Sequence, residues 1–252
     1  MSLVLLLCVV WGFQQVAMKG VALDVLPIMQ LTIRFALAAV FFAAWVLLAE
    51  GRRAFSDGTL PSGLLLGVMF SLEFLLVGQA LRYTTAAHTI VFLYSAPIFT
   101  AMGLQFHPEE RLSRLQWLGI AIAFVGIAIA FLGFTATPPM EMLRGDVLAL
   151  LAGAFWGFSN VVLRRGQVSH AAAYKTVFYQ IGTASILLGG FAIATGQTHV
   201  ALKPLSIASL AYQTLIISVA SYLIWFWLLK TYQTSRLMLM SFVTPLFGVL
   251  FG

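Results

Sequence analysis

Charged side chains are scarce in this chain, which has 14 Lys and Arg and 8 Asp and Glu among its 252 residues. Only 9% of the residues are charged, whereas soluble domains carry roughly a quarter. The chain is instead 61% hydrophobic, with a mean hydropathy of +0.99. These proportions exclude a soluble globular protein and indicate a chain embedded in lipid.

Residues that build metal sites and active sites are equally few. Cys8 is the single cysteine, so the chain has neither an internal disulfide framework nor a cysteine metal site. His88 has no second histidine or carboxylate at ligand spacing, which argues against a metal centre. Neither a nucleophile with its base nor paired carboxylates occur at workable spacing for an active site. We therefore predict no enzyme activity, cofactor or metal; a membrane-embedded enzyme or an assembly scaffold is the remote alternative to transport.

Long apolar runs fill almost the whole chain. A run of about 20 residues can cross the hydrocarbon core of a membrane as a helix, and continuous runs favour helices over a barrel. The nine predicted spans are 2–18, 27–49, 61–81, 86–105, 114–134, 145–163, 171–195, 205–229 and 234–252. We predict an all-α polytopic membrane protein without a soluble domain. A cleaved signal peptide is the alternative for the first span, but that span lacks a basic leader.

The basic residues fall mainly in the turns between spans and indicate orientation rather than a nucleic-acid partner. If the N-terminus is cytoplasmic, nine of the 14 lie on the cytoplasmic side, four on the other side and one within a span. The nine are Arg52, Arg53, Arg111, Arg114, Arg164, Arg165, Lys175, Lys230 and Arg236; the four are Lys19, Arg82, Arg144 and Lys203; the last is Arg34. The sequence thus predicts a cytoplasmic N-terminus.

The chain also repeats itself. Trp11-Gly12-Phe13 recurs 145 residues later as Trp156-Gly157-Phe158. The run from Ala80 to Thr84, followed by Pro97, returns at an offset of 148 residues as Leu228 to Tyr232, followed by Pro245. Because five spans precede the midpoint, the second copy enters the membrane from the opposite side, which makes the repeats inverted and typical of a transporter. We expect repeats at 1–137 and 138–252, joined by the polar, proline-bearing segment 134–139.

The second copy is shorter than the first. About 30 residues follow the Pro97 region and supply a fifth span, whereas seven follow Pro245. The repeat therefore predicts a ten-helix fold of two five-helix halves, with nine helices in this chain and the last one missing; a genuine nine-span version of the fold is the alternative.

The order and spacing of these pieces, with Pro27 and Arg34-Phe35 in the second span, resemble the EamA-type drug/metabolite transporter superfamily over the whole chain. Within it, the chain is most similar to bacterial YddG-type exporters of aromatic amino acids. The resemblance implies ten helices, a central cavity, alternating access by rocking of the halves, a bacterial inner-membrane location, and Arg34 at a packed position.

Arg34 and Glu73 are charged residues within predicted spans, where charges are costly and mark a site or a partner. Their opposite signs suit a buried ion pair between adjacent helices. Glu73 is alternatively a proton carrier or a partner for a substrate ammonium group.

Two helices combine an aromatic ring with an amide four residues later. Trp11, Gln15 and Met18 share one face of the first helix, with Gln14 off that face, and Trp156 and Asn160 repeat the spacing. A polar amide on an apolar helix faces a cavity or hydrogen-bonds a neighbouring helix. Both alternatives remain open.

The fourth and eighth spans supply the other candidates. His88, Phe92 and Ser95 share a face from which Tyr94 diverges; His88 could couple protons to substrate or simply hydrogen-bond at a helix end. Pro97 and Pro245 predict kinks, which serve either as hinges or as static bends. Tyr222 leads an aromatic group with Trp225 and Trp227 that stacks on substrate or forms an interfacial girdle.

The candidate substrate-binding residues are thus Trp11, Gln15, Glu73, His88, Phe92, Ser95, Trp156, Asn160 and Tyr222, and the candidate hinges are Pro97 and Pro245. An apolar, aromatic interior suits neutral or zwitterionic solutes. We expect export of small neutral or amphipathic metabolites, above all amino acids; a drug or other metabolite exporter is the alternative. The expected partners are a small-molecule substrate and the lipid bilayer, and the sequence is compatible with a monomer.

Overall fold

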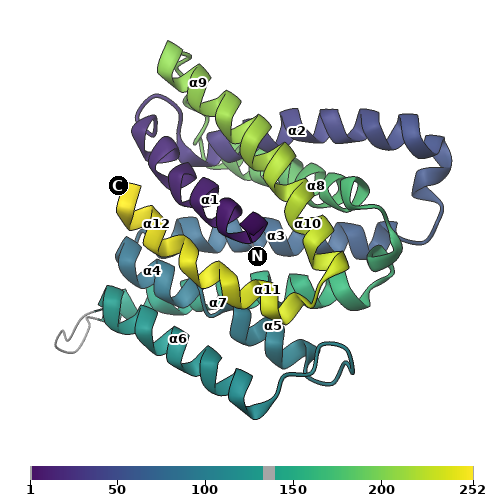
Figure 1. Ribbon diagram of the computed structural model, residues 1–252. Helices are drawn as coiled ribbons and strands as arrows, with labels where there is room; N and C mark the ends of the chain where they lie inside the picture. The colour runs from purple at the N-terminus through teal and green to yellow at the C-terminus, as the bar shows by residue number, and fades with distance from the viewer. Residues whose placement is uncertain (1, 133–139, 252) are drawn as a thin grey trace.

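The computed structural model describes residues 2–132 and 140–251, and the regular elements in these ranges are helices (Figure 1). For description, 2–132 is called the first half and 140–251 the second half. The predicted joint at 134–139 lies outside the described residues.

The helices follow the predicted spans closely. The first half contains α1 (Ser2–Gly20), α2 (Pro27–Glu50), the short η1 (Gly51–Phe55), α3 (Leu60–Ala80), α4 (Ala86–Leu93), α5 (Ala96–Leu104) and α6 (Arg114–Leu132). The second half contains α7 (Met140–Arg165), the short η2 (Gln167–His170), α8 (Ala173–Ala194), α9 (Pro204–Tyr212), η3 (Gln213–Ser221), α10 (Tyr222–Thr231), α11 (Thr234–Met240), η4 (Ser241–Val243) and α12 (Thr244–Phe251). Within the described ranges these elements make nine passes, because α4–α5, α9–η3–α10 and α11–η4–α12 each continue one pass. Six passes, with α9–η3–α10 counted as one continuous helix, are long and apolar enough to cross a membrane. This confirms a polytopic helical membrane fold.

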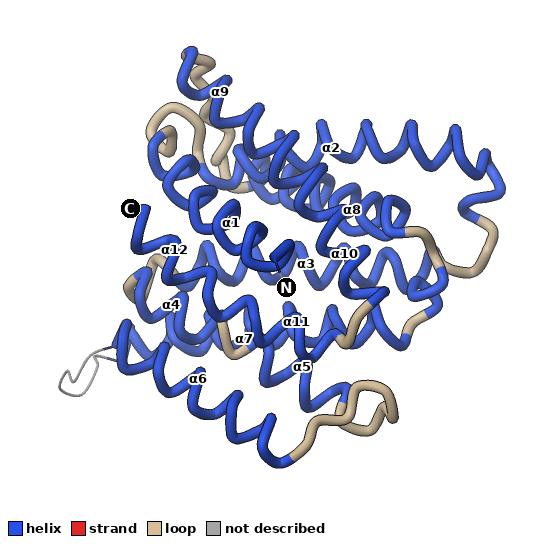
Figure 2. The backbone as a smooth tube through the Cα atoms, viewed as in Figure 1, coloured by secondary structure: helices blue, strands red, loops and turns tan. Residues whose placement is uncertain are grey.

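Loops gather at two opposite ends of the helical bundle (Figure 2). One end holds the loops after η1, α5, α7 and α10, and we call it the Glu110 end after a buried carboxylate there. The opposite end holds the loops after α1, α3 and α8, and we call it the Asp146 end. The sequence predicts that the Glu110 end is cytoplasmic.

Two passes are interrupted just before a proline, as the sequence predicts. α4 stops at Leu93 and α5 resumes at Ala96, with Pro97 as its second residue. In the second half, η4 separates α11 from α12, where Pro245 is again the second residue. Proline lacks the amide proton that would continue the preceding helix, and its fixed φ suits a first helical turn. The predicted kinks are therefore confirmed as helix breaks.

Two glycines allow helices of the two halves to pack closely on each other. An added Cβ on Gly12 of α1 would lie 2.7 Å from Cβ of Phe247 in α12. An added Cβ on Gly157 of α7 would lie 2.5 Å from Cβ of Phe99 in α5. Only glycine allows backbones to approach this closely. The first helix of each half therefore packs on the broken pass of the other half, at positions that the sequence repeat relates.

The eighth pass contains a π-helical segment, η3, whose inner face is polar. Ser218 Oγ donates to the carbonyl of Gln213, five residues earlier, at 3.1 Å. Gln213 Nε2 donates to Oε1 of Gln30 in α2 at 2.7 Å, deep in the bundle. Wide helical turns of this kind are frequent at functional sites. The segment joins the two halves through buried amides.

Candidate functional site

Four aromatic rings from three helices meet in the interior, and we call them the aromatic cluster: Phe35 of α2, Phe70 and Phe74 of α3, and Tyr222 of α10. The Phe35 ring lies 5.3 Å from that of Phe70 and 5.7 Å from that of Phe74. The Tyr222 ring lies 6.0 Å from Phe70, nearly perpendicular to it. Such edge-to-face packing is favourable for aromatic rings. Tyr222, a predicted substrate contact, therefore belongs to an apolar wall shared by both halves.

Arg34 lies beside this cluster and is fully buried. Its guanidinium carbon stands 4.8 Å from the centre of the Phe35 ring and 6.0 Å from that of Phe74. With the Gln14 amide oriented to satisfy its neighbours, the Gln14 oxygen accepts from Nη1 at 2.6 Å and Nη2 at 3.3 Å. Nε has no partner within the described structure. Aromatic faces and one amide oxygen thus hold the cation.

The predicted ion pair between Arg34 and Glu73 is wrong. Six ion pairs occur among residues 2–132 and 140–251, and this pair is not one of them. Side chains of α2 and α3 do meet at this level, since the Phe35 and Phe74 rings lie 5.7 Å apart. The guanidinium group of Arg34 nevertheless turns to α1. Gln14, which the helical spacing had set aside, takes the place of Glu73 as the partner of Arg34.

Glu73 is also buried, with 8% of its surface exposed. Its Oε2 atom has no hydrogen-bond partner among the described residues. Glu73 lies in one turn of α3 with Phe70 and Phe74, two members of the aromatic cluster. An ionisable group inside a membrane protein is costly and points to function by default. Glu73 therefore stays the strongest of the predicted substrate or proton contacts.

Trp11 connects α1 to the eighth pass. Its Nε1 donates to Oγ of Ser221 at 2.9 Å, and its ring meets the edge of Trp225 at 5.2 Å. Trp225 is buried whereas Trp227 is 47% exposed, so only Trp227 suits an interfacial girdle. Gln15 lies in α1, but its side chain falls outside the described structure.

The corresponding aromatic–amide pair in α7, Trp156 and Asn160, forms a hydrogen bond within its own helix. Asn160 Nδ2 donates to the Trp156 carbonyl at 2.9 Å and approaches Sδ of Met238 in α11 at 3.5 Å. The Trp156 ring meets the edge of Tyr94 at 5.5 Å. Tyr94 is the C-terminal cap of α4, and its backbone amide still donates to the Ile90 carbonyl at 2.9 Å.

His88 lies at the Asp146 end, in the first turn of α4. Its Nδ1 is 3.1 Å from each carboxylate oxygen of Asp146 in α7, and Thr84 Oγ1 donates to the same carboxylate at 2.7 Å. Ser95 Oγ donates to the Phe92 carbonyl at 2.6 Å, across the helix break. An added Cβ on Gly153 of α7 would lie 2.6 Å from that hydroxyl oxygen. His88 and Ser95 therefore make local contacts with α7, and Asp146 is a partner the sequence analysis missed.

Contacts between the halves close the Glu110 end. Glu110 is completely buried; its carboxylate accepts from Arg164 Nε at 3.0 Å and from the backbone amides of Thr234 and Ser235, the first residues of α11. Lys175 Nζ lies 2.9 Å from Glu50 and 2.6 Å from Asp57. Each of these interactions joins one half to the other.

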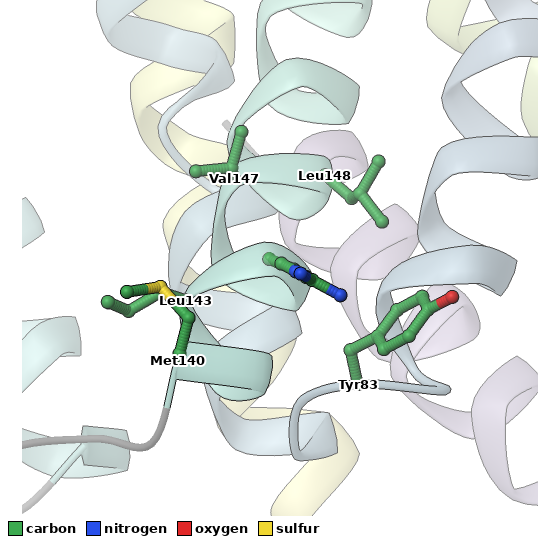
Figure 3. Close-up of a pocket in the computed structure, with 6 residues that line it drawn as sticks. Tyr83, Met140, Leu143, Val147 and Leu148 are labelled. Carbon is green, nitrogen blue, oxygen red and sulfur yellow. The ribbon is translucent and has the colours of Figure 1, made fainter.

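Two surface pockets are lined by other residues. One, of about 470 Å³, is lined by Tyr83, Met140, Leu143, Arg144, Val147 and Leu148 at the Asp146 end (Figure 3). The other, of about 440 Å³, is lined by residues of α2, α3 and α8, including Ala39, Leu64 and Gly182. Neither is lined by a predicted substrate-binding residue. Within the part of the chain that the structure covers, no cluster of three metal-binding side chains occurs.

Comparison with known proteins gives consistent results. Residues 1–132 and 143–252 match the model of the EamA-like transporter family. The chain is 28% identical to a "Probable amino-acid metabolite efflux pump" of Escherichia coli and 26% identical to one of Salmonella typhimurium, covering 98% of this chain and 83% of each relative. An "Uncharacterized transporter YoaV" of Bacillus subtilis is 20% identical, over 96% of this chain and 84% of the relative.

A solved protein crystal structure shares the fold. It superposes with a TM-score of 0.81 at 16% sequence identity, covering 98% of this chain and 85% of that one.

Proposed function

The chain belongs to the EamA-like transporter family, and from that membership we propose that it exports small neutral or amphipathic metabolites, chiefly amino acids, including aromatic ones. The chain is a transporter and not an enzyme. The relatives named amino-acid metabolite efflux pumps support this substrate class. We place it in a bacterial inner membrane with its N-terminus in the cytoplasm, because nine of its basic residues then face the cytoplasm.

The aromatic cluster is the observation that carries the substrate class. Phe35, Phe70, Phe74 and Tyr222 offer an apolar surface deep in the bundle, with contributions from both halves. Flat or aliphatic side chains bind such a surface by burying apolar area. Phosphorylated solutes require several cations, whereas Arg34 is the one basic residue beside this cluster among the described residues. Neutral and zwitterionic solutes fit best.

We propose that transport proceeds by alternating access of two inverted repeats, 1–137 and 138–252. Two separate family matches, one in each half, support the repeat. The reciprocal contacts of Gly12 with Phe247 and of Gly157 with Phe99 support a two-fold relation between the halves. Interactions between the halves occur at both ends, through Glu110 and through Asp146, so each end can open while the other stays closed.

The same apolar surface also suits larger lipophilic cations or drugs, so a drug or other metabolite exporter is the second candidate. Purified protein in liposomes separates the two. Vesicles loaded with phenylalanine, methionine or threonine should release them faster than protein-free vesicles do. Release of a lipophilic dye without release of any amino acid would favour the drug exporter, and release of neither would contradict both.

A further inference from the structure

Two opposite charges lie buried in the bundle without forming a pair with each other. Arg34 is fully buried and Glu73 is 8% exposed. Arg34 Nε and Glu73 Oε2 both lack a partner within the described part of the chain. Nearly all buried polar atoms in proteins have one, and unpartnered charges in a membrane are especially costly. Two such atoms of opposite sign call for a specific explanation.

The surroundings of Arg34 fix its orientation. The Gln14 oxygen accepts from Nη1 and Nη2, while the rings of Phe35 and Phe74 stand at 4.8 Å and 6.0 Å from the guanidinium carbon. These contacts neutralise no charge, because an amide and two phenyl rings are neutral. The Nε–H therefore remains available as a charged donor.

The aromatic cluster relates the two charges in space. Glu73 lies between Phe70 and Phe74 in one turn of α3, and the guanidinium carbon of Arg34 stands 6.0 Å from the Phe74 ring. The Tyr222 ring packs on Phe35 and Phe70, at 6.3 Å and 6.0 Å. The cation, the carboxylate and the aromatic cluster thus form one neighbourhood, contributed by α2, α3 and α10.

We propose that this neighbourhood is the binding site for a zwitterionic amino acid, an inference that rests on the proposed function. Arg34 binds the α-carboxylate, Glu73 binds the α-ammonium group, and the aromatic cluster holds the side chain. The substrate supplies the two opposite charges that the protein lacks there. A proton carrier would use Glu73 alone and would leave the buried Arg34 without a role.

The test compares ligands that differ only in their charged groups. L-phenylalanine carries both charges, phenethylamine lacks the carboxylate, and 3-phenylpropionate lacks the ammonium group. Each competes for efflux of labelled phenylalanine from proteoliposomes, and each is also scored by the thermal stabilisation that it gives the purified protein. The wild type should prefer phenylalanine over both analogues by at least about tenfold, since a site built for a charged group rejects a ligand that lacks it.

Substitutions should then change the preferences reciprocally. Glu73→Gln should lose the preference over 3-phenylpropionate and keep that over phenethylamine, while Arg34→Gln should do the reverse. Arg34→Lys, which keeps the charge, should retain part of the preference and serves if the glutamine variant fails to fold. Glu141→Gln and Arg165→Gln make the same chemical changes at exposed positions and should leave both preferences unchanged.

Each outcome decides between the two proposals. Two results would overturn the zwitterion site while leaving export intact. In the first, competition and thermal stabilisation by all three ligands fall equally in both variants. In the second, the wild type releases phenylalanine but does not distinguish it from the analogues. A wild type that neither releases nor binds any of the three ligands overturns the proposed amino acid export itself.

Discussion

Most hydroxyl groups within the passes are satisfied by their own helix. Ser71 donates to the carbonyl of Gly67 at 2.6 Å, and Thr176 donates to that of Ala172 at 3.1 Å, in each case four residues earlier. This bond costs the helix little and removes a polar group from lipid. Arg34 and Glu73 have no such local solution because their side chains are long and charged. A few neutral side chains, such as those of Thr214 and Thr244, also have an unpartnered atom among the described residues, but Arg34 and Glu73 differ from them in carrying a charge.

Asp57, in the loop after η1, gives a pH prediction at the residue scale. Burial opposes its ionisation, but hydrogen bonds from Lys175 and Thr59 outweigh burial and lower the pKa of Asp57 to about 2. A depressed carboxyl pKa stabilises the fold above its ordinary value near 3.8, and that stability is lost as pH falls through about 2. Because the carboxylate is 41% exposed, its contribution should stay under about 1 kcal/mol.

Thermal unfolding in detergent between pH 6 and pH 2 measures this contribution. Asp57→Asn should lower the melting temperature at pH 6 and narrow its difference from the wild type as pH approaches 2. A difference that does not depend on pH would show that the carboxylate charge is irrelevant. Glu141→Asn, at an exposed site, controls for the general effect of removing a carboxylate.

At the scale of helices, the contacts of Gly12 and Gly157 predict that substitution of either glycine destabilises the protein. Gly12→Ala and Gly157→Ala should each destabilise the protein by about 1–3 kcal/mol, because the new methyl group meets the backbone of the opposite helix as well as a side chain. Gly126→Ala in α6 is the matched control, since nothing lies within 4 Å of its added Cβ. Melting temperatures of the three variants check the prediction, and equal values for all three would contradict it.

The broken passes predict substitutions that change the transport rate without changing the stability of the fold. If Pro97 and Pro245 are hinges, Pro97→Ala and Pro245→Ala should slow amino acid efflux several-fold without lowering the melting temperature, because a continuous helix resists bending. Initial efflux rates at saturating substrate give the measurement. Normal rates in both variants would show that the bends are static.

At the scale of the whole molecule, closure of the Glu110 end should depend on one buried carboxylate. Glu110→Gln removes the charge that holds Arg164 and the first turn of α11, a loss of about 1.5–3 kcal/mol for each charged hydrogen bond. Cys8 reports the result, since it is the chain's single cysteine, is fully buried and has Sγ 3.7 Å from the carbonyl of Met240. Its alkylation should accelerate about tenfold for every 1.4 kcal/mol lost.

The neighbouring carboxylate provides the control for this experiment. Glu109 also contacts Arg164, at 3.3 Å, but it is 74% exposed. Exposed ion pairs contribute little, so Glu109→Gln should leave Cys8 labelling close to that of the wild type. Equal acceleration in the two variants would locate the effect in the net charge of the loop rather than in the buried contact.

The helical passes could be predicted from the sequence because membrane spans depend on composition over about 20 residues, which one chain displays directly. The breaks could be predicted as well, since proline acts locally. Partners could not. Arg34 binds Gln14 of α1 rather than Glu73, although the Phe35 and Phe74 rings beside the two charges touch, because the direction of a long buried side chain depends on the packing of several helices. The contact of Tyr94 with Trp156 joins helices 62 residues apart in the sequence, which helical spacing within one segment does not reveal.

The contact between Gly12 and Phe247 also bears on the order in which the protein is assembled. Helices enter the membrane as they are synthesised, and domains fold from the N-terminal side. Gly157 finds Phe99 as soon as α7 is made, but Gly12 must wait until α12 leaves the ribosome. Until then the surface of α1 around Gly12 faces lipid or a temporary neighbour. α1 is therefore inserted before α12 but locked in place only after α12 has been made.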